Sequence, residues 1–97
     1  MNSKIKSKEV DFLFSAILEL KNEDECYQFF EDLCTVNELK AMSQRLVAAK
    51  MLSEGRVYSD IVEATGASTA TISRVKRSLE YGCDSYSFIF DRMVDQK

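Results

Sequence analysis

One short segment of the chain combines hydroxyl groups and cations. Its candidate contact residues are Ser68, Thr69, Ala70, Thr71, Ser73, Arg74, Lys76 and Arg77. Hydroxyls can hydrogen-bond base edges, phosphates or bridging water, and arginine or lysine can neutralise phosphates. The side chains at the start of the segment are short enough for close approach to base edges, and no acidic residue occurs from 64 to 79. This composition predicts contact with nucleic acid through one local face.

The flanking residues predict the element that positions these side chains. We expect Ser59 to cap a short helix over 60–65, Gly66 to turn the chain, and Ser68 to cap a longer helix that ends at Gly82. The inward faces of the two helices would be formed by Ile61, Ile72, Val75 and Leu79. Two helices joined by a tight glycine turn are typical of a DNA-binding helix-turn-helix, here at about 58–81.

Apolar residues recur at three- and four-residue spacing through the rest of the chain, and no strand pattern competes. Asn22 with Glu25 forms a capping box, as does Thr35 with Glu38. The pattern predicts further helices over 10–21, 22–33 and 36–53 and in the segment after Asp84. Whether 36–53 is one helix or two with a break at Ser43 is left open. The expected fold is therefore all-α, with six or seven short helices.

Length and charge limit what the whole chain can do. It has 97 residues and a net charge of −3, from 13 Lys and Arg against 16 Asp and Glu. This allows one domain and provides no general attraction for nucleic acid or anionic membrane. We expect residues 1–8 to be a flexible polar tail and residues 9–97 a single helical domain. Because so short a chain buries a modest core, a core shared by two subunits is also expected.

Missing residue types argue against catalytic and metal chemistry. The chain has no His, no Gly-rich phosphate loop and no Cys beside a base, so neither an enzyme nor a metal site is expected. Cys26, Cys34 and Cys83 form no Cys-x-x-Cys pair, which fits a reducing compartment. The polar N-terminus and the lack of a long apolar run indicate neither a signal peptide nor a membrane helix. The expected location is the cytoplasm, with no membrane partner.

Aromatic residues fall on the predicted helical stripes. Such stripes are usually core, so we expect the rings to be buried. The residues concerned are Phe12, Phe14, Phe29, Phe30, Phe88 and Phe90. Phe12 lies off the main stripe of its helix and broadens the apolar face beyond what one neighbour can cover, so a second subunit could cover it.

Two longer runs carry a family resemblance. The chain contains SQRLVAAKMLSEG followed by YSDIVEATGASTATISRVKRSLEYG, and the similarity extends back through TVNEL at 35–39. These runs resemble the Trp repressor superfamily, and most of all the YerC/YecD-like branch of small bacterial Trp-repressor-related proteins. The resemblance implies a transcriptional repressor that is an intertwined all-helical homodimer. Its two recognition helices would enter successive major grooves of a near-palindromic operator, the docking for which the Trp repressor is an established example.

The resemblance also implies where an effector would bind. In the Trp repressor, tryptophan wedges beneath the recognition helix. Thr35 and Arg45 match one wall of that pocket, and Arg74 and Ser78 match the other. Val75 departs from the pattern, because the repressor has glycine there and a branched side chain would crowd an indole ring. Tryptophan is therefore not expected as a corepressor and no cofactor is expected, while a smaller carboxylate stays open as an effector.

A protein-interaction or regulatory module is the alternative function. Ser59, Val62 and Glu63 stand where the first helix of the repressor motif presents basic residues to DNA. The N-terminal half also carries an acidic cluster, formed by Glu23, Asp24, Glu25, Glu31 and Asp32. An interaction module would keep the helix-turn-helix only as a packing unit and use this acidic surface to meet a partner. The same acids are also favourable near a helix N-terminus, without any partner.

Overall fold

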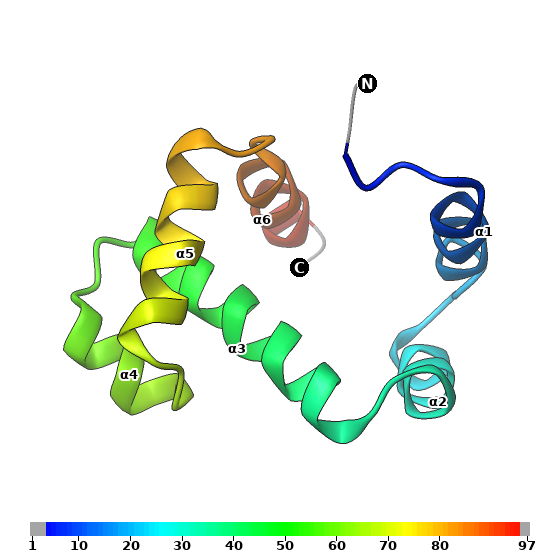
Figure 1. Cartoon of the computed structure of the whole chain (residues 1–97), viewed down its shortest axis with the longest axis horizontal. Helices are drawn as coiled ribbons and strands as arrows, with labels where there is room; N and C mark the ends of the chain where they lie inside the picture. The colour runs from blue at the N-terminus through cyan, green and yellow to red at the C-terminus, as the bar shows by residue number, and fades with distance from the viewer. Residues whose placement is uncertain (1–3, 96–97) are drawn as a thin grey trace. The chain divides into compact units, whose positions relative to one another are not determined.

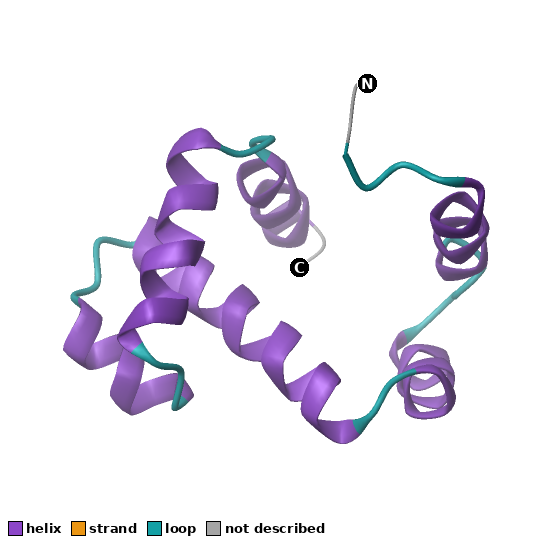
Figure 2. Ribbon diagram, viewed as in Figure 1, coloured by secondary structure: helices purple, strands orange, loops and turns teal. Residues whose placement is uncertain are grey.

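A computed structural model describes residues 4–95, which contain helices and no strand (Figures 1 and 2). The helices are α1 (Lys8–Ile17), α2 (Glu23–Leu33), α3 (Val36–Ser53), α4 (Tyr58–Thr65), α5 (Thr69–Tyr81) and α6 (Ser85–Asp95). The all-α class expected from the sequence is confirmed, with six helices in this range. No helix within the described range is long and apolar enough to cross a membrane.

The chain divides into two compact units, the first ending at Val36 and the second beginning at Asn37. The first unit contains α1 and α2, and the second contains almost all of α3 together with α4, α5 and α6. The expected division into a tail at 1–8 and a domain at 9–97 stays a prediction. Residues 1–3 of that tail, and 96–97 at the other end, lie outside the described residues.

In the first unit, α1 is shorter than predicted. Ser7 caps its start by accepting the N–H of Val10 at 3.1 Å. Its last turn tightens, since the N–H of Glu19 donates to the carbonyl of Ala16 at 3.1 Å and leaves the regular helical ladder. The predicted end at residue 21 is wrong because Asn22, the N-cap of α2, needs an extended backbone (φ −158°, ψ 175°) just after it.

The capping box predicted for α2 forms with one difference. Asn22 Oδ1 accepts the N–H of Glu25 at 2.9 Å, as expected for an N-cap. Glu25 Oε1 accepts the N–H of Lys21 at 2.9 Å, one residue before the expected donor. The two side-chain bonds thus define the end of the connection where the chain enters α2.

The second unit begins with one continuous helix. α3 has 18 residues, and Ser43 donates to the carbonyl of Leu39 at 2.9 Å inside it, so no helix starts at Ser43. Gly55 ends the helix with φ +80°, and its N–H donates to the carbonyl of Leu52 at 3.0 Å. The N–H of Arg56 reaches the carbonyl of Met51 at 3.0 Å. These two bonds form a Schellman motif, which requires the left-handed residue that glycine supplies.

α4 begins two residues earlier than the sequence predicted. Val57 occupies the N-cap position, with an extended backbone and no side-chain cap, and Tyr58 is the first helical residue. The cap predicted at Ser59 is therefore wrong. The N–H of Ile61 donates to the carbonyl of Val57 at 3.3 Å, so the first turn is already closed before Ser59 could act as a cap.

The buried core belongs to the second unit and is small. It consists of Ala48, Ala49, Met51, Ile61, Ala67, Ile72 and Val75, with Leu52, Tyr58, Val62, Tyr86 and Phe90 packed against it. The inward positions predicted at Ile61, Ile72 and Val75 are confirmed, and Leu79 is half-buried. Ala48 and Ala49 of α3 lie in this core together with Ile61 of α4 and with Ile72 and Val75 of α5. Their small side chains leave room for α4 and α5 against α3.

The phenylalanines are not all buried in the single chain, and the sequence left open whether their core belongs to one chain or to two. Phe12 is 78% exposed, and Phe14 and Phe88 are about half exposed. Phe29 and Phe30 contact each other edge to face with their ring centres 5.6 Å apart, and both are half-buried. Phe90 stacks on Tyr86, and both pack against the buried core from α6. The buried residues come instead from α3, α4, α5 and the turn before α5.

Candidate nucleic-acid interface

The turn between α4 and α5 is held by hydrogen bonds on both sides of its glycine. Gly66 adopts φ +75°, and its N–H donates to the carbonyl of Val62 at 2.8 Å, which ends α4. Thr65 Oγ1 donates to the carbonyl of Ile61 at 2.7 Å and accepts the N–H of Ala67 at 3.0 Å. Ala67 is buried in the core. The direction in which α5 leaves the turn is therefore closely defined.

Ser68 caps α5 as the sequence predicted. Its Oγ accepts the N–H of Thr71 at 3.2 Å and lies 3.1 Å from Thr71 Oγ1, to which it donates. The first turn of α5 contains no acidic residue. The backbone N–H groups at this helix end therefore have no carboxylate from the same turn beside them. A helix N-terminus of this kind favours an anion such as a phosphate.

Five of the eight candidate contact residues share the outer face of α5. All five are exposed, and helical periodicity places them away from the buried side chains of Ile72 and Val75. They are Thr69, Ala70, Ser73, Arg74 and Arg77. This face offers hydroxyl groups and small side chains near the helix start and two guanidinium groups farther along, so it can insert closely and neutralise phosphates.

The other three candidates have different surroundings. Ser68 is exposed but acts as the cap, and Thr71 is half-buried with its N–H and hydroxyl bonded to Ser68. Lys76 lies on a flank of α5, with its Nζ 4.0 Å from Glu80 Oε1 one turn later. Both groups are about half exposed, so this ion pair contributes little to stability. The structure therefore separates Lys76 from the two arginines.

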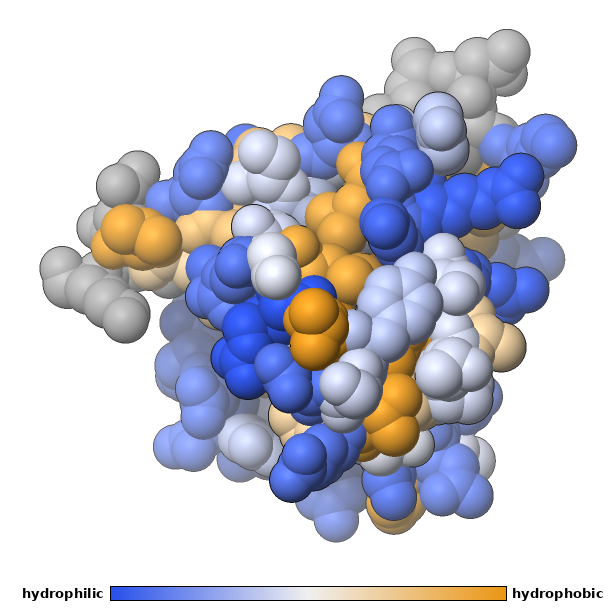
Figure 3. Space-filling view, turned by 90° about the vertical axis from the view of Figure 1, so that its left-hand side faces the viewer, coloured by the Kyte–Doolittle hydropathy of each residue, from blue (hydrophilic) through white to orange (hydrophobic). Residues whose placement is uncertain are grey.

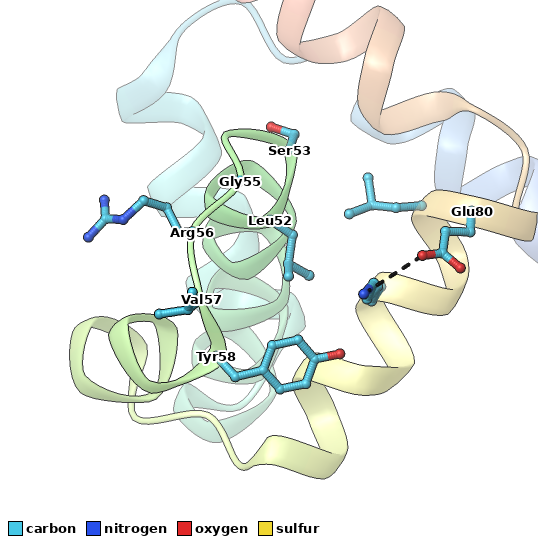
Figure 4. A pocket seen from close by; sticks show the side chains of 9 residues that line it. Leu52, Ser53, Gly55, Arg56, Val57, Tyr58 and Glu80 are labelled. Atoms are coloured by element: carbon cyan, nitrogen blue, oxygen red, sulfur yellow. Dashed lines mark ion pairs between the residues drawn. The ribbon is translucent and has the colours of Figure 1, made fainter.

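A cavity of about 630 Å³ lies beside Lys76, between the end of α3 and the second half of α5. Figure 3, which faces the side of the molecule where α4 and the α3–α4 loop lie, shows hydrophobic residues gathered among hydrophilic ones. In Figure 4, Leu52 and Tyr58 extend toward α5 whereas Arg56 points away. The full lining is Leu52, Ser53, Gly55, Arg56, Val57, Tyr58, Lys76, Leu79 and Glu80. The sequence pattern did not indicate this cavity.

The four residues matched to an effector pocket are distributed over both units. Thr35 directly precedes α3 and belongs to the first unit. Arg45, Arg74 and Ser78 are exposed on α3 and α5 of the second unit, and Ser78 Oγ donates to the carbonyl of Arg74 at 3.3 Å. Val75, the residue that departs from the repressor pattern, is 2% exposed and belongs to the core. Within residues 4–95, no group of three potential metal-ligating side chains lies together.

Gln44, which was not predicted from the sequence, connects α3 to the helix-turn-helix. Its Nε2 donates to the carbonyl of Thr65 at 2.8 Å, across 21 residues of sequence. A signal was present, because Gln44 stands four residues before Ala48 and seven before Met51, on the buried stripe of α3. A polar residue on an apolar stripe indicates a specific hydrogen-bond partner.

Known proteins match almost the whole of this sequence. The model of the Trp repressor protein family matches residues 8–94. The chain belongs to the Trp repressor family. Its relatives include the YerC protein of Bacillus subtilis (strain 168), whose activity is uncharacterised; the two are 57% identical over 92 residues, which are 95% of this chain and 88% of YerC. The Trp repressor family is one of regulators rather than enzymes.

Solved structures with the Trp repressor family fold agree with this assignment. A Staphylococcus aureus protein, provisionally named a Trp repressor, is 59% identical, with a TM-score of 0.89 over 93% of this chain and 90% of that one. A TrpR-like protein from Eubacterium eligens is 60% identical, with a TM-score of 0.90 over 95% of each chain. The fold and the YerC-like relationship that the sequence runs implied are thus confirmed.

Proposed function

We propose that this protein is a sequence-specific DNA-binding transcriptional regulator, a repressor by analogy with its family, acting in the bacterial cytoplasm. Each subunit inserts α5 into a major groove of the operator. The observation that supports this most strongly is the outer face of α5, where Thr69, Ala70 and Ser73 precede two exposed arginines. The chain as a whole has a net charge of −3, but this face of α5 carries positive charge beside small side chains that let the helix approach the DNA bases closely.

The regulator acts as a homodimer, because two recognition helices about one DNA turn apart, roughly 34 Å, are needed to read two half-sites. The apolar surface of the single chain supports this part of the proposal. Phe12 on α1 and Leu18, the C-cap of α1, are 78% and 83% exposed. In the second unit, Leu46, Val47, Phe90, Met93 and Val94 line an apolar cavity of about 330 Å³. A second copy would remove these surfaces from water.

Sedimentation tests the dimer. The expected species has about twice the chain mass of 11.1 kDa at micromolar concentration. Met93 is 53% exposed in the single chain, so a Met93→Glu variant should be neutral in a monomer and should dissociate a dimer that buries it. A wild-type protein that sediments as a monomer contradicts the dimer.

DNA selection from random sequences, followed by binding measurements at several salt concentrations, tests the DNA-binding function. The expected result is an enriched near-palindrome that binds far more tightly than random DNA. Exchanging Arg74 and Arg77 for Ala should weaken binding to operator and random DNA alike and lower the salt slope by about 0.9 for each phosphate that is no longer neutralised.

Lys8→Ala with Lys21→Ala provides the charge-matched control. These two cations are exposed on the first unit, outside α5, and the double variant removes the same total charge. It should keep an affinity and a salt slope close to those of the wild type. If selection yields no preferred sequence and both double variants behave as the wild type does, the protein is an interaction module and its helix-turn-helix only a packing unit.

A further inference from the structure

Gln44 provides the side-chain hydrogen bond by which α3 holds the helix-turn-helix. Its Nε2 lies 2.8 Å from the carbonyl oxygen of Thr65, the last residue of α4, and both residues are half-buried. The last carbonyls of a helix have no partner within it. The N–H of Gly66 already serves the carbonyl of Val62, so Gln44 supplies from another helix the donor that the end of α4 lacks.

This hydrogen bond lies at the solvent-exposed edge of the contact between α3 and α4. An open surface groove of about 240 Å³ runs beside it, with Lys40, Ser43, Val47 and Ala64 completing the lining. These four residues are all exposed. The hydrogen bond between Gln44 and Thr65 therefore joins the two helices outside the buried core and adds a directional restraint to the packing within that core.

Thr65 passes this constraint on to the recognition helix. Its hydroxyl accepts the N–H of Ala67, and Ala67 directly precedes Ser68, the cap of α5. Gly66 lies next to the side-chain amide of Gln44, because a Cβ built on Gly66 would stand 3.6 Å from Gln44 Nε2, which is ordinary contact. A change at Gln44 thus acts on the turn that sets the direction of α5, at a distance from the outer face that would touch DNA.

We propose that Gln44 is a positioning residue for DNA recognition: its hydrogen bond to Thr65 fixes the direction in which α5 leaves the turn after α4, and hence the preference for operator over random DNA. This inference rests on the proposed DNA-binding function. Gln44 itself need not touch DNA. Its effect is on specificity, because phosphate contacts hold any sequence whereas base contacts require the correct helix angle.

The test uses the full-length protein with Gln44→Met, which keeps an unbranched side chain of similar length and removes the donor. In the free protein, amide exchange at Gly66 and Ala67 should accelerate by about fivefold, the usual effect of removing one hydrogen bond, while exchange at Ile72 changes less. Affinity for the selected operator should fall by about fivefold while affinity for random DNA stays unchanged. Ser43→Ala, which removes a hydroxyl bonded only within α3, is the control and should alter neither quantity.

Gln44→Glu tests directly whether residue 44 donates to the carbonyl of Thr65, whereas the operator preference tests the positioning role. An ionised carboxylate cannot donate to the carbonyl of Thr65, but a protonated one can. The ¹³C shift of that carbonyl should therefore differ from wild type at neutral pH and return toward it as the glutamate protonates, near its ordinary pKa of about 4.3. The Gln44→Met variant should show no such return.

The outcomes separate this inference from the proposed function. If Gln44→Met leaves exchange in the turn unchanged, Gln44 holds nothing and the inference is overturned. If the wild type selects an operator and Gln44→Met loosens the turn yet keeps the same preference for operator over random DNA, the positioning role is overturned. If the wild type selects no operator, the DNA-binding proposal fails and this role for Gln44 fails with it, while the exchange and ¹³C data still report whether Gln44 restrains the turn.

Discussion

Ser68 Oγ lies 3.2 Å from the backbone nitrogen of Thr71 and 3.1 Å from its hydroxyl, so one side chain at the start of α5 engages the same residue twice. The hydroxyl of Ser68 serves the helix, yet it also sits at the end of α5 that would approach DNA. Two substitutions separate these roles.

Ser68→Ala should lower the free energy of unfolding by about 1 kcal/mol, because the variant has no N-cap acceptor. Ser68→Asp should leave it within about 0.5 kcal/mol of wild type, because aspartate is an equally good cap. Operator affinity should fall further with Ser68→Asp than with Ser68→Ala, since a carboxylate would face the phosphates. Chemical denaturation and a binding titration check the two quantities, and a Ser68→Asp variant that binds as well as wild type would place this helix end away from DNA.

Glu63→Lys should strengthen binding to DNA of any sequence. Glu63 is exposed on α4, so in the proposed DNA complex its carboxylate would oppose nearby phosphates. We expect a salt slope that is steeper by about 0.9 for each additional phosphate neutralised. Glu31→Lys makes the same charge change at an exposed residue of α2 and is the control. It should change DNA affinity and the salt slope much less. Equal gains from both variants would mean that net charge alone matters.

Gly82→Ala should destabilise the protein more than Gly55→Ala does. A Cβ at Gly82 would overlap the backbone carbonyl of Ser78, whereas a Cβ at Gly55 meets nothing and suffers only from φ +80°. We expect a loss of roughly 2–3 kcal/mol for Gly82→Ala and of about 1 kcal/mol for Gly55→Ala. Thermal unfolding of both variants measures the difference, and an equal cost would show that the end of α5 relaxes freely.

Tryptophan should not bind the wild-type protein in a calorimetric titration at concentrations up to about 1 mM, so that any binding free energy is weaker than about −4 kcal/mol. Val75 fills the core beneath α5 and is 2% exposed, so an indole ring would have to displace it. Val75→Gly should raise any affinity for tryptophan. It should also lower the free energy of unfolding by about 3 kcal/mol, because less apolar surface is buried and because glycine is unfavourable within a helix. Micromolar binding by the wild type would contradict this proposal.

Local patterns predicted the helix-turn-helix well because its determinants are local. Ser68 caps α5, Gly66 turns the chain, and Ile61, Ile72 and Val75 are buried, as their spacing indicated. Each of these features depends on residues a few positions apart. The cap expected at Ser59 failed because a neighbouring backbone bond, from Ile61 to the carbonyl of Val57, closes the turn first.

Features that depend on distant segments were not predictable in the same way. A helical stripe shows that Phe88 prefers an apolar partner, but it does not say whether that partner belongs to the same chain, and Phe88 is 43% exposed in the single chain. Gln44 finds its acceptor 21 residues away, and the cavity beside Lys76 exists only once α3 and α5 meet. The structure was likewise needed to show that five of the eight candidate contact residues share one face of α5 and that Lys76 lies apart from them.

The two sides of α5 carry independent information. Ile72 and Val75 face the core, whereas Thr69, Ala70 and Ser73 face outward and touch none of it. Exchanges at such surface positions usually change stability by no more than about 0.5 kcal/mol. Gene duplicates could therefore diverge to control different promoters while keeping one scaffold, and a library randomised at these three positions should yield repressors of new specificity that remain folded.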